Sequence, residues 1–293
     1  ASDVYKRQAS VMYELVEGWI SYSLAKVYNP DFKYWQGVEC AFYAAFYRVA
    51  TLGSGAGVAA IYYFNERGVP YSKGTGLYTI EYMLHKVSIA LFAGIFFILN
   101  WGYMQKYYSQ YDMTLLIGFG VTFVIAAVLL LFACSKKFHE VLLWIVRKLN
   151  RSGKLTEQVK KLEEQCAILE DAAATLLKRG GLIAGCILKN LLKFTFWYGI
   201  PFLILAETGK LTLSQGLAVT SLAMMLAAVI PGPAGIGSSE FVLTMLLAKI
   251  VGTGAAGSVA LLYRFATFVL PFVIGAVVVV LWRRVHRSTE KAA

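Results

Sequence analysis

The chain has 293 residues, of which 58% are hydrophobic and 15% are charged, with a formal net charge of +11. A soluble domain of this length carries roughly a quarter of its residues as charged side chains. The composition therefore excludes a soluble enzyme and indicates an integral membrane protein. The basic residues are concentrated beside apolar segments, as in membrane proteins. The sequence has no group of interleaved aromatic and basic residues of the kind that binds nucleic acid, so we expect no nucleic-acid partner.

Taken in chain order, residues 1–8 are polar, and apolar character begins abruptly at Ala9 within a helix predicted to end near Tyr28. We expect 1–8 to be a leader foreign to the natural protein and 9–293 to be one membrane domain. The apolar segments after this helix are each about 20 residues long, which suits a helix across a bilayer. They predict an all-α membrane protein with about five spanning helices, at 77–99, 113–133, 182–206, 211–230 and 255–282.

The basic residues predict the orientation. Residues 135–180 form the longest polar stretch and hold ten Lys and Arg residues, and Arg283 and Arg284 come after the last apolar segment. Basic loops stay in the cytoplasm, so we expect loop 135–180 and the C-terminus to be cytoplasmic.

Within this loop, apolar residues recur at alternating steps of four and three from Leu155 to Leu176, which predicts an amphipathic helix. Such a stripe is typical of a helix that packs on its own protein or on the membrane, or of a homodimeric coiled coil. Residues 137–150 have an apolar face with basic flanks, which indicates a helix at the membrane interface.

The sequence contains an internal repeat. At an offset of 178 residues, the Gly-rich segment 54–58 aligns with 232–236, and Lys86 aligns with Arg264. Each repeat (about 36–99 and 212–282) has an apolar run, a Gly/Pro break, a second short run and a long helix. The breaks predict re-entrant hairpins at about 36–64 and 212–251. The long helices must cross in opposite directions, and inverted repeats of this kind are typical of transporters.

Ionisable residues within apolar segments are candidates for function. Glu240 lies directly after the second break and Arg264 lies well inside its segment, so the pair predicts either substrate contact or a structural salt bridge. Glu81, His85 and Lys86 are expected near the cytoplasmic interface, and Lys189, Lys193 and Lys249 near segment ends. Arg48 completes this set. The four cysteines and three histidines have no metal-site spacing, so we expect no metal, cofactor or catalytic nucleophile.

Two segments carry a family resemblance. VIPGPAGIGSSE (229–240) and LLYRFATFVLP (261–271) resemble signatures of the flippase-like membrane family, the transmembrane region of bacterial lysylphosphatidylglycerol synthases and their stand-alone relatives. YELVEG (13–18) and IYYFNERGVP (61–70) are similar to the family too. Gly235, Gly237, Glu240 and Arg264 fall on motif positions, whereas Pro233 stands where the family usually has glycine.

The resemblance implies movement of an aminoacylated or other polar phospholipid between the leaflets of a bacterial cytoplasmic membrane. Lysyl transfer in the family belongs to a soluble domain after the membrane half, so we expect this chain not to be an enzyme. Two alternatives are a membrane platform for a separate soluble transferase and a transporter of another amphiphile. The expected substrate-binding residues are Gly55, Gly57, Glu81, Lys86, Pro231, Gly232, Pro233, Gly235, Gly237, Glu240 and Arg264.

Overall fold

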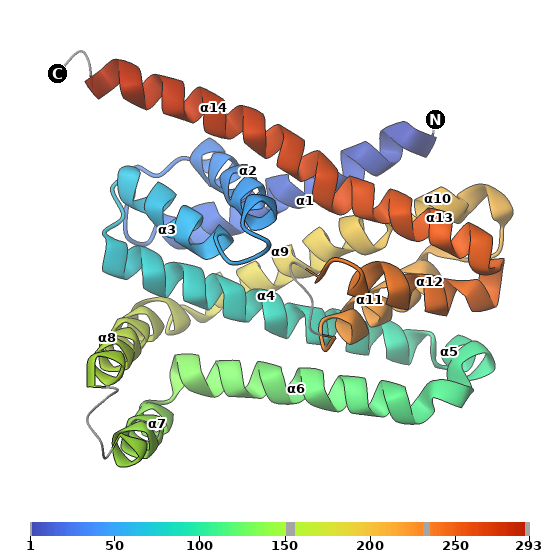
Figure 1. Ribbon diagram of the computed structural model, residues 1–293, viewed down its shortest axis with the longest axis horizontal. Coiled ribbons are helices and arrows are strands. Elements are labelled where there is room, and N and C mark those ends of the chain that lie inside the picture. The colour runs from blue at the N-terminus through green and yellow to red at the C-terminus, as the bar shows by residue number, and fades with distance from the viewer. Residues whose placement is uncertain (1, 151–155, 231–234, 291–293) are drawn as a thin grey trace.

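The computed structural model describes residues 2–150, 156–230 and 235–290, and in these residues every regular element is a helix (Figure 1). The first half contains α1 (Ser2–Ala25), α2 (Tyr34–Ala50), α3 (Ala56–Glu66), α4 (Tyr71–Leu99), α5 (Trp101–Tyr108), η1 (Ser109–Tyr111) and α6 (Asp112–Cys134). The middle contains α7 (Lys136–Leu149), α8 (Thr156–Ala172), the π-helical η2 (Ala173–Leu177), α9 (Gly180–Tyr198), α10 (Ile200–Leu205) and η3 (Ala206–Thr208). The last part contains α11 (Leu213–Ala227), α12 (Ser238–Val251), α13 (Thr253–Arg264), the π-helical η5 (Phe265–Val269) and α14 (Leu270–Glu290).

Two of the described helices are long and apolar enough to cross a membrane: α4, and the continuous helix Thr253–Arg284 made of α13, η5 and α14. A third candidate is the pair 117–132 and 136–148, which is bent by 95°. Two expected spans are shorter helices in the structure. Segment 182–206 is divided between α9 and α10 at Gly199, and segment 211–230 forms the 15-residue α11, about 22 Å long.

The two long helices run in opposite directions along the molecule (Figure 1). Each is preceded by two short helices joined by a break: α2 and α3, which pack against each other, and α11 and α12, which do the same. These pairs occupy the ranges where the Gly/Pro breaks predicted hairpins. In the first connection Leu52 and Gly53 have positive φ angles, and in the second Gly235 and Gly237 do. The turns therefore use left-handed backbone, which glycine adopts without steric cost.

The first helix, α1, continues without interruption from Ser2 to Ala25. The backbone of α1 comes unusually close to that of α2. A Cβ atom on Gly37 would collide with the carbonyl oxygen of Gly18. Glycine at both positions lets the two backbones touch, which fixes the side chains that α1 and α2 contribute to the interior.

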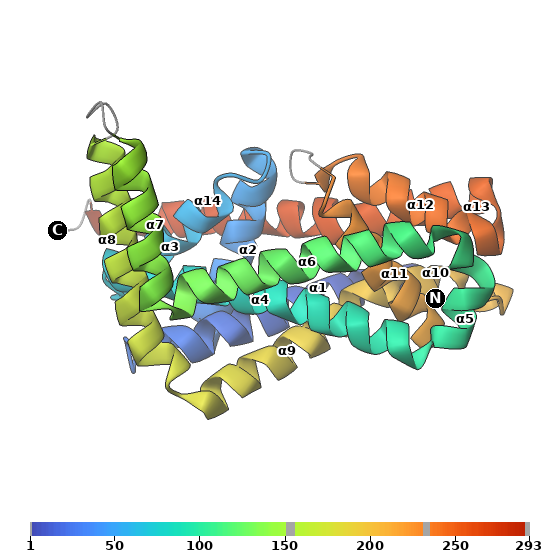
Figure 2. The same ribbon diagram turned by 90° about the horizontal axis from the view of Figure 1, so that it is seen from below.

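At one end of the molecule, α7 and α8 lie side by side across the end of α6 (Figure 2). Val159, Cys166, Leu169 and Leu176 of the predicted stripe are buried, and α8 packs against α4, α6 and α7. The stripe is thus covered by the protein's own helices. His139 on α7 is the centre of this corner: its ring contacts the Phe132 carbonyl at the end of α6 and the Glu170 carboxylate on α8.

Candidate functional site: a polar cavity lined by α1 to α4

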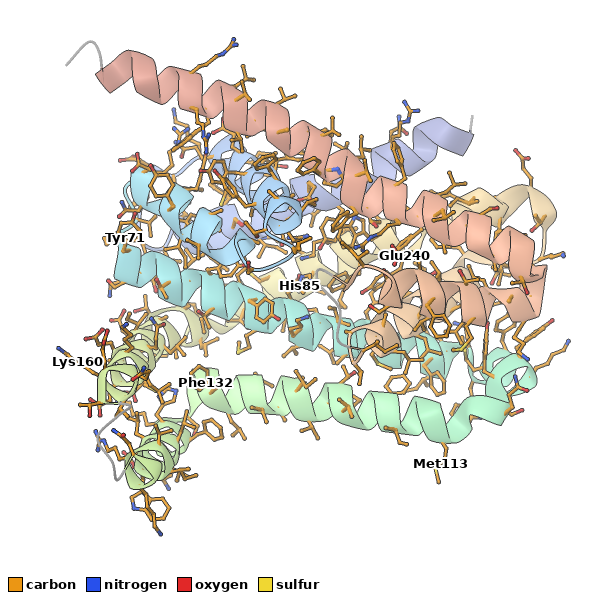
Figure 3. The ribbon with its side chains drawn as sticks, viewed as in Figure 1. Tyr71, His85, Met113, Phe132, Lys160 and Glu240 are labelled. Carbon is orange, nitrogen blue, oxygen red and sulfur yellow. The ribbon has the colours of Figure 1, made fainter. Side chains whose placement is uncertain are left out.

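A cavity of about 500 Å³ is lined mainly by α1, α2, α3 and α4. Gly53 and Gly235, from the two connections, both line it. His85 of α4 also lines it, whereas Glu240 at the start of α12 does not. Figure 3 labels both residues on their helices. The remaining lining residues come from α1, α2, α3, α4 and α9: Tyr13, Glu17, Ser21, Cys40, Ala41, Ala44, Arg48, Ala56, Ala60, Tyr78, Glu81, Tyr82, Lys86 and Trp197.

Two cations line the cavity without an anionic partner among the described residues. Arg48, near the end of α2, makes no hydrogen bond or ion pair to any of them through its side chain. Lys86, on α4, contacts the face of Tyr82, with its Nζ 5.2 Å from the ring centroid, and forms no ion pair there. A guanidinium can donate two parallel hydrogen bonds to one phosphate, so the cavity lining includes groups chemically suited to an anion.

Each of the two carboxylates that line the cavity accepts a hydrogen bond from one neighbouring side chain. Glu81 is 7% exposed, and its Oε1 accepts a hydrogen bond of 2.7 Å from the Ser21 hydroxyl. Glu17 Oε2 accepts a hydrogen bond of 2.5 Å from Lys193 Nζ. Lys193 Nζ also lies 3.0 Å from Nδ1 of His85. Because an ammonium group can only donate, Nδ1 of His85 is the acceptor and its proton is on Nε2.

Aromatic rings complete the wall behind this ion pair. Tyr13 stacks on Trp197 with a centroid distance of 3.5 Å and an interplanar angle of 7°. Lys193 Nζ lies 5.2 Å from the centroid of Tyr13 and 5.1 Å from that of Phe194. Aromatic faces attract cations, so the wall stabilises a buried ammonium group in addition to the Glu17 carboxylate.

Glu240 and Arg264 form a separate cluster. Arg264 Nε lies 3.1 Å from Glu240 Oε1, and its guanidinium is 3.9 Å from the centroid of Phe268. Glu240 Oε2 accepts hydrogen bonds of 2.9 Å from the Gly237 amide and the Ser239 hydroxyl. Glu240 thereby caps the N-terminus of α12, where the first amide groups have no helical partner. The pair ties the second connection to the long helix, as the salt-bridge alternative predicted.

Of the predicted site residues, Glu81, Lys86 and Gly235 line the cavity. Glu240 lines a neighbouring, mainly apolar groove of about 760 Å³ between α12 and α13. Gly55 precedes α3, with its amide bonded to the Thr51 hydroxyl, and a Cβ atom on Gly57 would meet the Tyr78 ring at 2.7 Å. Neither glycine lines the cavity, although Tyr78, which lies beside Gly57, does. Pro231, Gly232 and Pro233 lie outside the described residues.

Glu17 and Tyr13 were not among the residues predicted from the sequence, and Lys193 was expected at a segment end. Lys193 is instead 0% exposed, in the interior of α9. A pattern in α1 could have indicated this site: Ser10, Glu14, Glu17 and Ser21 recur at steps of four, three and four. That spacing puts all four on one helical face, and a polar face on an otherwise apolar helix is turned toward a polar interior. No cluster of potential metal ligands occurs among the described residues.

The family comparison covers this whole region. A family model described as "Lysylphosphatidylglycerol synthase TM region" matches residues 12–275, which include every residue that lines the cavity. The chain belongs to this family. No curated protein and no solved structure matches it.

Membership in the lysylphosphatidylglycerol synthase transmembrane-region family, together with the long apolar helices, makes the chain a membrane protein with a lipid-related function. The match agrees with the resemblance of segments 229–240 and 261–271. It extends over both helix pairs, α4 and the first part of the second long helix, so the polar cavity lies within the region that the family model describes.

Proposed function

We propose that the protein is a lipid flippase that moves a phospholipid with an aminoacylated or other polar headgroup between the leaflets of a bacterial cytoplasmic membrane. The observation that carries this proposal is the polar cavity, in which Arg48 and Lys86 lack anionic partners among the described residues while Glu17 and Glu81 lie on the same surface. A lipid headgroup with a phosphate and an amine carries a negative charge complementary to the two cations and a positive charge complementary to the two carboxylates.

In this proposal α4 and α13–α14 cross the membrane as inverted repeats, with α7, α8 and the C-terminus on the cytoplasmic side. The α2–α3 and α11–α12 pairs enter from opposite sides, and their connections meet at the cavity. Lys86 lies 15 residues after the start of the 29-residue α4, about 22 Å along a helix of about 43 Å. In this proposal, that position is near the middle of the bilayer, whereas the sequence analysis expected Lys86 near the cytoplasmic interface.

The headgroup chemistry is complementary to these side chains. Arg48 and Lys86 would bind the phosphate, and Glu81 and Glu17 would attract an ammonium group. The acyl chains would remain in the surrounding lipid. Charged groups are costly in hydrocarbon, so a cavity that supplies opposite charges at mid-membrane lowers the barrier for the headgroup crossing. Arg264 and Glu240 have a different role in this scheme, because they bind each other and hold the start of α12.

A lipid-flipping assay in proteoliposomes tests the proposal. A fluorescent lysyl-phosphatidylglycerol would be bleached from outside, with empty vesicles as the baseline. We expect protein-dependent access to the inner leaflet, at least tenfold slower in Arg48→Gln. The matched control is Arg67→Gln, because Arg67 is bonded to Glu39 and does not line the cavity. Equal rates for wild type and Arg48→Gln would contradict the assignment of the site, and access equal to empty vesicles would contradict flipping.

A second candidate function comes from the description of the family, which names a synthase. In that case the membrane helices would present lipid to a soluble transferase encoded separately, and this chain would not catalyse the transfer itself. Co-purification of such a transferase with the chain, combined with no flipping in proteoliposomes, would favour the platform. Uptake that is indifferent to the lipid headgroup would favour transport of another amphiphile.

A further inference from the structure

Glu14 is a buried carboxyl group that the proposed lipid site does not use. It lies on α1, one turn before Glu17, and is 1% exposed. Neither of its two carboxylate oxygens has a hydrogen-bond partner among the described residues, and each has less than 1 Å² of accessible surface. Glu14 is not among the residues that line the cavity, so water in the cavity does not reach these oxygens.

An ionised carboxylate in this position would be unstable. A buried charge without a hydrogen bond or a bonded counter-ion costs far more than a buried neutral acid, so the group either holds a proton or acquires a cation. The charged groups that face Glu14 are Glu17 on its own helix, Arg48 on α2 and Lys193 on α9.

The elements packed against α1 leave one candidate cation. On α9, Lys193 is bound to Glu17 and to His85 of α4, and Lys189 donates a hydrogen bond to the Ser23 hydroxyl. On α4, Glu81 is bonded to Ser21 and Lys86 lies over the Tyr82 ring.

The remaining neighbours of α1 add no charge near Glu14. The helices α10 and η5 have no ionisable residue, and the described basic side chains of α14, Arg283 and Arg284, come after its apolar part. Arg48 is therefore the cation that lies within electrostatic range of Glu14 and has no ion pair among the described residues.

We propose that Glu14 is a proton-binding site whose protonation releases Arg48 for an anionic headgroup. In the arrangement seen here, Arg48 lines the cavity and the Glu14 carboxyl is unbonded, which corresponds to the protonated form. Loss of the proton would leave a carboxylate that pairs with Arg48 and withdraws it from the cavity. Binding of a phosphate-bearing lipid is then linked to uptake of one proton. The identity of the ligand in this inference rests on the proposed function, whereas the protonation of Glu14 is independent of it.

Infrared spectroscopy of the purified full chain tests the protonation without any lipid. We expect an absorption band of a protonated carboxyl group that disappears in Glu14→Gln. Glu39→Gln is the matched control, because Glu39 is bonded to Arg67 and Tyr63 at the surface of α2 and should contribute no such band. A band that is unchanged in Glu14→Gln would overturn the proposal, even if lipid flipping were demonstrated.

Lipid affinity as a function of pH tests the link to Arg48. Short-chain phosphatidylglycerol and inorganic phosphate would be titrated into wild type and Glu14→Gln in detergent. For one linked proton, wild-type affinity should fall about tenfold per pH unit once Glu14 ionises, and Glu14→Gln should lack this fall. Identical pH profiles would overturn the linkage. Binding of the lipid without binding of phosphate would identify the lipid headgroup as the ligand. No binding by either protein would count against the proposed function, and the infrared band would still decide the proton site.

Discussion

Lys193 Nζ lies 2.5 Å from Glu17 Oε2, although the lysine has no exposed surface and the two residues are 176 positions apart in the chain. The ion pair joins α1 to α9 beside the polar cavity. Removal of either partner would leave a charge buried without its counter-ion, so this contact should matter to folding as well as to the charge balance of the cavity.

Replacement of Lys193 by methionine should lower the free energy of unfolding by about 3–5 kcal/mol, because Glu17 would lose the cation that compensates its burial. Thermal unfolding in detergent would measure the loss, with the exposed Lys160→Met on α8 as the control. Adding Glu17→Gln should recover part of the stability. If Lys193→Met unfolds like Lys160→Met, the pair is not a significant source of stability.

The Glu240–Arg264 pair should couple α12 to the long helix. A double-mutant cycle with Glu240→Gln and Arg264→Gln should give a coupling energy of about 1–3 kcal/mol, since the two groups are mostly buried and share a hydrogen-bond network. The exposed pair Glu157–Lys161 provides the comparison, with an expected coupling below about 0.5 kcal/mol. Equal coupling in the two cycles would show that Arg264 does not hold the second connection.

The contact between α1 and α2 should not tolerate a side chain. Gly37→Ala would drive a methyl group into the Gly18 carbonyl oxygen, so the helices must separate at a cost of about 1–3 kcal/mol. Gly94→Ala is the matched control: nothing lies within 4 Å of its Cβ position in α4, and alanine there should raise stability by up to about 1 kcal/mol. Comparable melting temperatures for both variants would contradict this close approach.

The corner formed by α6, α7 and α8 should open at low pH. The hydrogen bond from His139 lowers the pKa of Glu170 below its ordinary value of 4.5. A carboxyl group with a depressed pKa contributes stability above its unfolded pKa, and that stability is lost as pH falls through the folded pKa. After correction for the intrinsic exchange rate at each pH, the protection of the α7 amides should therefore fall as the pH drops below 4.5, and Glu170→Gln should already show weak protection at neutral pH. Wild-type protection factors that stay constant over this range would contradict the role of Glu170.

The apolar segments and the internal repeat predicted the helical membrane fold, the two breaks and the opposed long helices, because bilayer thickness and backbone hydrogen bonding constrain them strongly. The site was predicted only in part. Glu81 and Lys86 were selected as charges within an apolar segment, whereas Lys193 was assigned to a segment end although it lies in the interior of α9 and is bound to Glu17 of α1. Which charges neutralise each other depends on packing between distant helices, so Glu17 and Lys193 could not be paired from sequence.

The π-helical segment η5 sets the rotational phase between the two halves of the longest helix. It begins directly after Arg264 and ends before Pro271, and Gly275, one turn further on, presses against the backbone of α2, where a Cβ atom would collide with the Phe42 carbonyl oxygen. A π turn holds one residue more than an α turn. If the same residues formed a regular α-helix, α14 would be rotated by about 100° relative to α13, and Gly275 would turn away from α2 while Arg264 stayed in place. The π turn thus accommodates one additional residue while the rotational orientation of α13 and of α14 about the helix axis stays the same. Deletion of one residue within η5 should preserve both the Arg264–Glu240 contact and the Gly275–α2 contact. Deletion of one residue on either side of η5 should break one of these two contacts.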